Sequence, residues 1–128
     1  MAFKLSYRSL SRLEGVHPHL VQVVERAILH TEVDFCVVEG VRSLATQRRY
    51  YDLGKTTTMN SRHLTGHAVD LAPWINGRID WENPIGWEGV SGAMKLAAHE
   101  LGIPLVWGGD WHTFIDKPHY QLPWKNYP

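Results

Sequence analysis

The sequence predicts an α+β fold, a single small domain in which a mainly antiparallel sheet packs against helices. The chain has 128 residues, close to the usual size of one domain with one core. Apolar residues recur at helical spacing in two separated segments. Short β-prone runs lie between and after these segments without strict alternation of strand and helix, which favours an antiparallel sheet over a doubly wound parallel one.

The first predicted helix begins at Pro18, a residue that suits the first helical turn. Apolar residues then follow at helical spacing: Leu20, Val23, Val24, Ala27 and Ile28. Residues 35–38 (Phe-Cys-Val-Val) form a short β-prone run, and Gly40 interrupts the pattern after it. This part of the chain therefore supplies one core helix and one strand.

The middle of the chain predicts a helix, a loop, a strand and a turn. Ser43 is a residue type that caps helices, and Gly54 would end the helix that follows. Residues 55–62 are polar and predict a surface loop. Residues 67–74 predict a strand, and the Asn-Gly pair at 76–77 is typical of a hairpin turn.

The last third of the chain predicts the second core helix, which ends at Gly102. Its apolar residues at helical spacing are Trp87, Val90, Met94, Ala97, Ala98 and Leu101. Residues 105–107 and 119–122 predict two short strands, joined by a loop over residues 108–118. Trp81 is expected to pack in the core together with Trp87.

Charge and composition exclude several classes of function. Thirteen basic residues balance thirteen acidic ones, so the chain lacks the positive charge expected of a nucleic-acid-binding protein. The amino terminus offers no apolar run typical of a signal peptide, and no stretch has the length of a membrane span. We therefore expect synthesis in the cytoplasm and no stable membrane association. The single cysteine, Cys36, is expected to be buried and inert.

A candidate metal site begins in the segment SRHLTGHAVD, residues 61–70. His63 precedes Asp70 by seven residues, with small residues between them. In an extended strand Asp70 and His67 face opposite sides, which favours Asp70 as the partner of His63. A catalytic zinc usually takes three protein ligands and leaves one position for water. His119, at the start of a predicted strand, is the best candidate for the third ligand.

Asp116 lies three residues before His119, where a carboxylate could stand beside a metal without binding it. Two neutral imidazoles and one carboxylate would leave a zinc site with a net charge of about +1, which retains Lewis acidity. Asp116 could accept a proton from the attacking water and return it to the leaving amine. These groups suit peptide hydrolysis, although similar ligands also accept other divalent metals.

These motifs resemble those of the LAS-type zinc peptidases. The resemblance rests on Ser-x-His-x-x-Gly-x-Ala-x-Asp at 61–70, acid-x-x-His at 116–119, Gly-Val-Arg-Ser at 40–43 and Trp-Gly-Gly-Asp-Trp at 107–111. It extends from about residue 35 to residue 122. The family includes D-Ala-D-Ala carboxypeptidases and dipeptidases and the phage L-alanyl-D-glutamate endopeptidases.

The resemblance implies a role for each matching residue. The zinc ligands would be His63, Asp70 and His119. Asp116 would be the catalytic acid/base; many members have Glu at this position, and Asp is similar to the short phage enzymes. Arg42 matches the family arginine that stabilises the substrate carbonyl or a neighbouring carboxylate, with Gln47 in support. Trp111 would form a wall of the substrate groove.

The favoured function is zinc-dependent hydrolysis of bacterial peptidoglycan at the L-Ala-D-Glu bond of the stem peptide, as in a phage endolysin that lyses its host. The short chain, the missing signal peptide and Asp116 favour this subclass. The alternatives are a D-Ala-D-Ala carboxypeptidase or dipeptidase and a noncatalytic zinc-binding module. We expect a monomer with one peptidase domain over residues 1–128 and no separate wall-binding domain. We expect this protein to reach the wall after the membrane is permeabilised.

Overall fold

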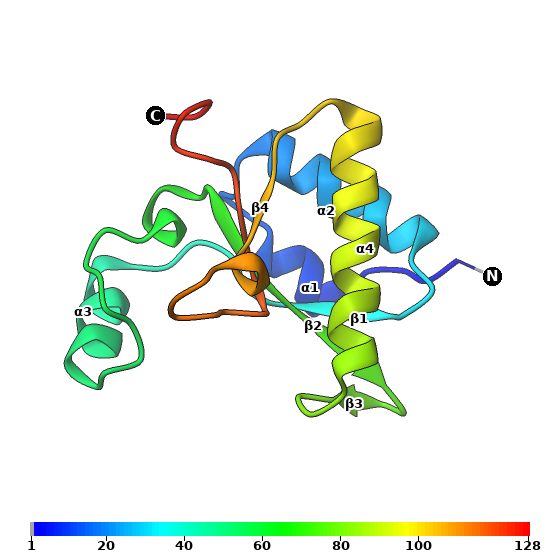
Figure 1. The fold of residues 1–128 in the computed structure, drawn as a ribbon, viewed down its shortest axis with the longest axis horizontal. Helices are drawn as coiled ribbons and strands as arrows, with labels where there is room; N and C mark the ends of the chain where they lie inside the picture. Colours follow the sequence, from blue (N-terminus) through cyan, green and yellow to red (C-terminus); the bar gives the residue numbers. More distant parts are fainter. Residues whose placement is uncertain (1) are drawn as a thin grey trace.

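The structure, a computed structural model, describes residues 2–128 and confirms the α+β fold. Helices and strands follow one another without regular alternation (Figure 1). In chain order they are α1 (Tyr7–Arg12), α2 (Pro18–His30), β1 (Phe35–Glu39), α3 (Leu44–Asp52), η1 (Arg62–Thr65), β2 (Ala68–Ile75), β3 (Arg78–Ile79), α4 (Pro84–Leu101), β4 (Val106–Trp107), η2 (Gly108–Asp110) and β5 (His119–Gln121).

The five strands form an antiparallel sheet in the order β1-β2-β5-β4, and β3 pairs with the end of β2. β2 therefore has a neighbour on each side. The register places Asp70 of β2 opposite Glu39 of β1 and opposite His119 of β5. A register shift in β1 between Val37 and Glu39 accompanies this pairing. Residues from three distant parts of the sequence thus meet at one level of the sheet.

One face of the sheet is covered by α2 and α4, which pack against each other (Figure 1). The apolar stripes of both helices and the inward side chains of β2 form the core: Leu20, Val23, Val24, Ala27, Val69, Leu71, Val90 and Met94 are all at most 1% exposed. Alternation along β2 buries Val69 and Leu71 and turns Asp70 to the other face, as the parity of the strand predicted. That second face carries the candidate site.

Local signals placed most element boundaries correctly. The Ser43 hydroxyl accepts a hydrogen bond from the amide of Thr46 and caps α3. Asn76 and Gly77 both have positive φ, as a two-residue hairpin turn requires. The sequence did not predict α1, a six-residue helix capped by Ser6. None of the helices among residues 2–128 combines the length and apolar character needed to cross a membrane.

Two expectations about single residues need correction. Cys36 is half-buried instead of fully buried, and burial raises the pKa of its thiol, which keeps the thiol protonated and unreactive. Trp81 is 50% exposed, while its neighbour Trp87 is only 5% exposed. The indole N–H of Trp87 donates to the carbonyl of Trp81 at 3.1 Å, so Trp87 enters the core and Trp81 remains at the surface.

Candidate metal centre and active site

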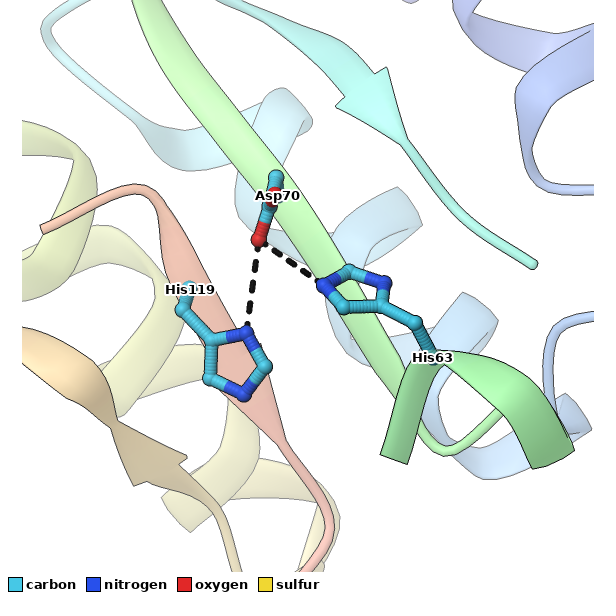
Figure 2. A group of neighbouring side chains, drawn as sticks. All are labelled: His63, Asp70 and His119. Atoms are coloured by element: carbon cyan, nitrogen blue, oxygen red, sulfur yellow. Dashed lines mark hydrogen bonds and ion pairs between the residues drawn. The ribbon is translucent and has the colours of Figure 1, made fainter. Parts of the chain in front are cut away.

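The three predicted ligands converge at one point on the open face of the sheet (Figure 2). His63 comes from η1, Asp70 from β2 and His119 from the start of β5. Their candidate ligand atoms all lie within 4.8 Å of one another. Asp70 Oδ1 is 3.1 Å from His63 Nε2 and 3.4 Å from His119 Nδ1. The spacing brings both imidazoles to the same carboxylate oxygen.

A tight reversal of the chain lets His63 and Asp70 face each other although they belong to one continuous segment. Ser61 caps η1 by accepting a hydrogen bond from the amide of His63, and Gly66 ends η1 in the left-handed region at φ 77°. A side chain at Gly66 would collide with the backbone carbonyl of Gly15. Glycine in the motif is therefore required both by conformation and by space.

Hydrogen bonds to the outer ring nitrogens fix the orientation of both imidazoles. His63 Nδ1 lies 2.7 Å from the carbonyl of Gly40, which can only accept, so Nδ1 carries the proton. His119 Nε2 lies 2.7 Å from the side-chain oxygen of Gln121 and donates to it. In neutral imidazoles the two remaining nitrogens then point lone pairs at Asp70. Such a set of electron-rich atoms fits a divalent cation such as zinc.

The electrostatics of the site agree with this donor set. Burial alone would raise the pKa of Asp70, but hydrogen bonds from His119 and His63 hold the pKa well below its usual range, so the carboxylate is charged. Burial opposes the charged form of His119, but the Asp70 carboxylate outweighs this effect and the net pKa of His119 is raised. The Asp70 carboxylate therefore favours a proton on His119, and this proton would compete with a cation for the same position.

Asp116 lies on the loop between η2 and β5 and lines the same cleft as the three candidate ligands. The loop folds back because the amide of Asp116 donates to the carbonyl of Gly108 at 3.0 Å. A side chain at Gly108 would collide with the backbone carbonyl of Asp116. Burial, and then the negative charge of Asp70, raise the pKa of Asp116. A raised pKa makes this carboxyl group better able to take up a proton and hold it than an ordinary surface carboxylate.

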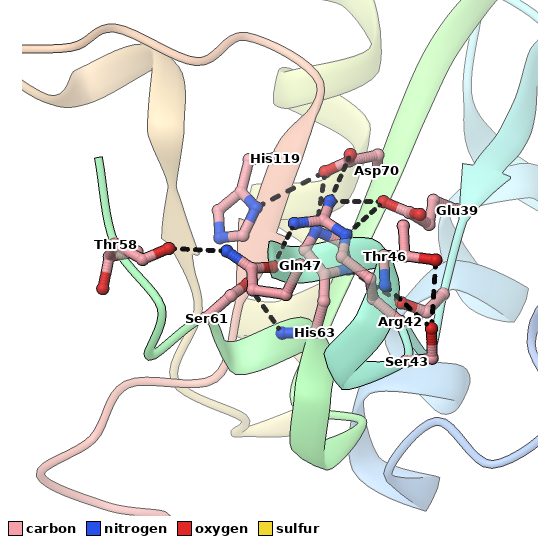
Figure 3. Close-up of polar contacts among 11 residues, drawn as sticks. Glu39, Arg42, Ser43, Thr46, Gln47, Thr58, Ser61, His63, Asp70 and His119 are labelled. Atoms are coloured by element: carbon pink, nitrogen blue, oxygen red, sulfur yellow. Dashed lines mark hydrogen bonds and ion pairs between the residues drawn. The ribbon is translucent and has the colours of Figure 1, made fainter. Parts of the chain in front are cut away.

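Arg42 lies between two carboxylates beside the candidate ligands (Figure 3). Its Nε donates to Glu39 Oε1 at 2.9 Å, and its Nη2 also contacts this oxygen and lies 3.9 Å from Asp70 Oδ2. Its Nη1 donates to Gln47 Oε1 at 2.7 Å, and the Gln47 amide donates to the carbonyl of Thr58 at 2.7 Å. Gln47 is fully buried behind Arg42, so it supports Arg42 and does not itself face the cleft.

Sequence reasoning did not single out Glu39, the residue that holds Arg42. Its only signal is its position at the end of a predicted strand, three residues before Arg42. The Glu39–Arg42 pair is local, and the register between β1 and β2 then brings Glu39 opposite Asp70. Arg42 then separates two like charges that the sheet places side by side.

The site opens into a cleft of about 610 Å³, a size typical of ligand-binding sites. α3 and the loop after it supply one group of lining residues, and the loop between β4 and β5 supplies another. Trp111 packs on the candidate ligand His119, with 5.2 Å between ring centroids, and lines the cleft. Further aromatic side chains line the cleft: Tyr50, Trp81, Phe114 and Trp124.

A small antiparallel α+β domain with two imidazoles, a carboxylate and a second carboxylate in one cleft has the groups expected of a metal-dependent hydrolase. A sequence model of the family described as phage L-alanyl-D-glutamate peptidase matches residues 1–121, and the chain belongs to this family.

Comparisons with individual proteins agree with this family. The chain is 37% identical to the L-alanyl-D-glutamate peptidase of Escherichia phage T5, over 91% of this chain and 87% of that protein. It is 28% identical to the peptidoglycan L-alanyl-D-glutamate endopeptidase CwlK of Bacillus subtilis, over 84% of this chain and 73% of that protein. The crystal structure of the L-Ala D-Glu endopeptidase ChiX of Serratia marcescens superposes with a TM-score of 0.92 at 42% identity, covering 98% of this chain and 94% of ChiX. The resemblance inferred from the motifs is confirmed.

Proposed function

We propose that this chain is a zinc-dependent peptidoglycan hydrolase that cleaves the L-Ala-D-Glu bond of the stem peptide. Membership of the phage L-alanyl-D-glutamate peptidase family supports the scissile bond. The observation that carries the metal is the convergence of three ligand atoms within 4.8 Å. The nearby Asp116 supplies the proton-transfer group that hydrolysis of an amide requires.

His63, Asp70 and His119 would hold the zinc, because their donor set and tautomers suit this ion. When bound, zinc would polarise the scissile carbonyl and lower the pKa of a water molecule. Gly40 and Gln121 would keep the two imidazoles in the binding orientation through the outer ring nitrogens. The glycine carbonyl is part of the backbone, so its contribution is fixed by the fold.

Asp116 would act as the acid/base. Its raised pKa allows it to take a proton from the attacking water and to return this proton to the amine of the leaving glutamyl residue. Both transfers need the same carboxyl group within reach of the cleft, which Asp116 lines. Trp111 would hold the substrate against the side of His119.

Arg42 would stabilise the negative charge that develops on the scissile carbonyl oxygen. Glu39 and Gln47 fix its guanidinium on two sides, so little reorganisation is needed during the reaction. Gln47 would act through Arg42 and not by touching the substrate.

In its biological setting we propose a phage endolysin that accumulates in the host cytoplasm as a monomer and reaches the wall after the membrane is permeabilised. Peptidoglycan would be its partner, and residues 1–128 would act as one peptidase domain. The phage relatives support this setting.

The proposal can be tested by measuring metal content and peptide hydrolysis in parallel. The wild-type protein is expected to bind one equivalent of zinc and to lose hydrolysis of an L-Ala-D-Glu peptide after chelation, with recovery on adding zinc. His63→Asn should lose both zinc and activity, whereas the exposed His99→Asn should keep both. Full hydrolysis by the chelated wild-type protein would overturn the metal assignment.

A further inference from the structure

Three Lys and Arg side chains line the cleft, and the reaction proposed above uses only one of them, Arg42. Arg42 is already paired within the protein: its side chain is 9% exposed, and it donates to Glu39 and Gln47 (Figure 3). A carboxylate of a bound substrate would meet the negative charge of Glu39 beside this guanidinium. Arg42 is thus arranged to face a carbonyl oxygen and is poorly arranged to bind a second carboxylate.

Arg62, another cation of the cleft lining, is also committed. It is 3% exposed, donates to the backbone carbonyl of Leu122 at 3.1 Å, and stacks on the ring of Trp124 with 4.0 Å to the centroid. These contacts fasten the segment after β5 to η1. They leave Arg62 as part of the framework at this edge of the cleft.

Lys55 is different, because this residue is exposed and lines the same cleft as His63 and Asp70. Among residues 2–128 no carboxylate pairs with the Lys55 side chain. Three carboxylates line the cleft, and Glu39 and Asp70 are bound by other partners. The third, Asp116, does not pair with Lys55 either, so Lys55 brings to the cleft a positive charge that no carboxylate among residues 2–128 pairs with.

The fold holds Lys55 in a defined position. Gly54, at φ 75°, turns the chain at the end of α3, and the amide of Lys55 donates to the carbonyl of Tyr50 at 2.8 Å. The ammonium then lies over the Tyr50 ring, 5.3 Å from the centroid, and Arg42 contacts the same ring at 4.8 Å. A contiguous series of groups thus runs from Asp70 through Arg42 and Tyr50 to Lys55.

The substrate of the proposed reaction carries a charge that matches this position. A glutamyl residue joined through its amine to alanine has two carboxyl groups, and at least one stays free when the peptide continues through the other. We propose that Lys55, positioned by Tyr50, binds this free carboxylate on the leaving side of the scissile bond. The flexible stem of lysine lets the ammonium swing from the ring to the carboxylate. This inference rests on the L-Ala-D-Glu peptidase activity proposed above.

The test compares two substrates that differ by one group: a stem peptide with the free glutamyl carboxylate and the same peptide with this carboxylate converted to a carboxamide. The zinc-loaded wild-type protein is expected to cleave the carboxylate form with a kcat/KM about tenfold higher, mainly through a lower KM. Lys55→Gln should lose about tenfold on the carboxylate form and be unchanged on the carboxamide form. Lys55→Arg should keep part of the preference.

Lys4→Gln is the matched control, because Lys4 is exposed and lines a different pocket beside α1; it should behave as wild type. Equal losses of Lys55→Gln on both substrates, or no loss on either, would overturn the assignment, as would a wild-type protein without a preference. An equal loss on both forms would also result if Lys55 bound a carboxylate farther along the stem peptide. Failure of the wild-type protein to cleave either peptide would instead refute the proposed function.

Discussion

Replacing Asp116 with asparagine removes the proposed acid/base while nearly preserving the size and shape of the side chain. General acid–base catalysis contributes about 10²–10⁴-fold, so kcat should fall by this factor, equivalent to roughly 3–5 kcal/mol. The folded protein should be no less stable, because burial and the charge of Asp70 already raise the pKa of Asp116 and disfavour its charged form. The variant should therefore be folded, zinc-loaded and nearly inactive.

The assay measures kcat on an L-Ala-D-Glu peptide, bound zinc and the thermal unfolding midpoint in the same preparations. Asp110→Asn is the control, since Asp110 lies in the same connection between β4 and β5 as Asp116 but does not line the cleft, is exposed and pairs with Lys95 at 2.8 Å. It should keep wild-type turnover. Loss of zinc in Asp116→Asn would mean that Asp116 is a ligand, and turnover within a few-fold of wild type would refute its role in proton transfer.

Three further predictions follow from the same contacts. Glu39→Gln loosens Arg42 and should lower kcat about tenfold with normal zinc content, measured by steady-state kinetics; an unchanged kcat would contradict the positioning role. Gly40→Ala places a methyl group against the last turn of α1 and should lower the free energy of unfolding, measured by urea denaturation, by about 1–3 kcal/mol. Gly92→Ala, which adds a methyl group in open space on α4, should not lower it. Equal effects of the two substitutions would refute the packing argument. Burial lowers the pKa of His119, but the Asp70 carboxylate outweighs burial and the net pKa is raised. The His119–Asp70 pair therefore stabilises the metal-free protein fully below the ordinary histidine pKa of 6.5, and this stabilisation is lost as the pH rises through the raised pKa. The increase in Tm caused by zinc should therefore grow with pH over this range, and a pH-independent increase would contradict the proposed competition between proton and metal.

Local sequence signals determined much of the fold because their physical causes are local. The cap at Ser43, the positive-φ pair at 76–77 and the glycine that ends α4 act within a few residues, and each was predicted from residue type alone. The parity of β2 likewise identified Asp70 as the residue that faces His63. α1 was missed because six residues are too few for a periodic apolar pattern.

The partners of the candidate ligands could not be predicted, because they depend on pairing between distant segments. Glu39 pairs locally with Arg42, three residues away, but it comes opposite Asp70 only through the register of β1 on β2, including its shift. Lys55 was assigned only to a polar loop, and its position on Tyr50 follows from the turn at Gly54. These residues carry ordinary surface-type side chains, so residue type alone gave no signal for their place in the cleft.

The most direct test of the central claim is mass spectrometry of purified Gram-negative peptidoglycan digested with the zinc-loaded protein, beside a chelated sample. The proposed function predicts zinc-dependent release of stem peptides with a free D-Glu amino terminus, leaving L-Ala carboxyl ends on the glycan. Loss of only the terminal D-Ala would contradict it and indicate a carboxypeptidase, and the absence of zinc-dependent cleavage would contradict the assignment of this chain as an active metallopeptidase.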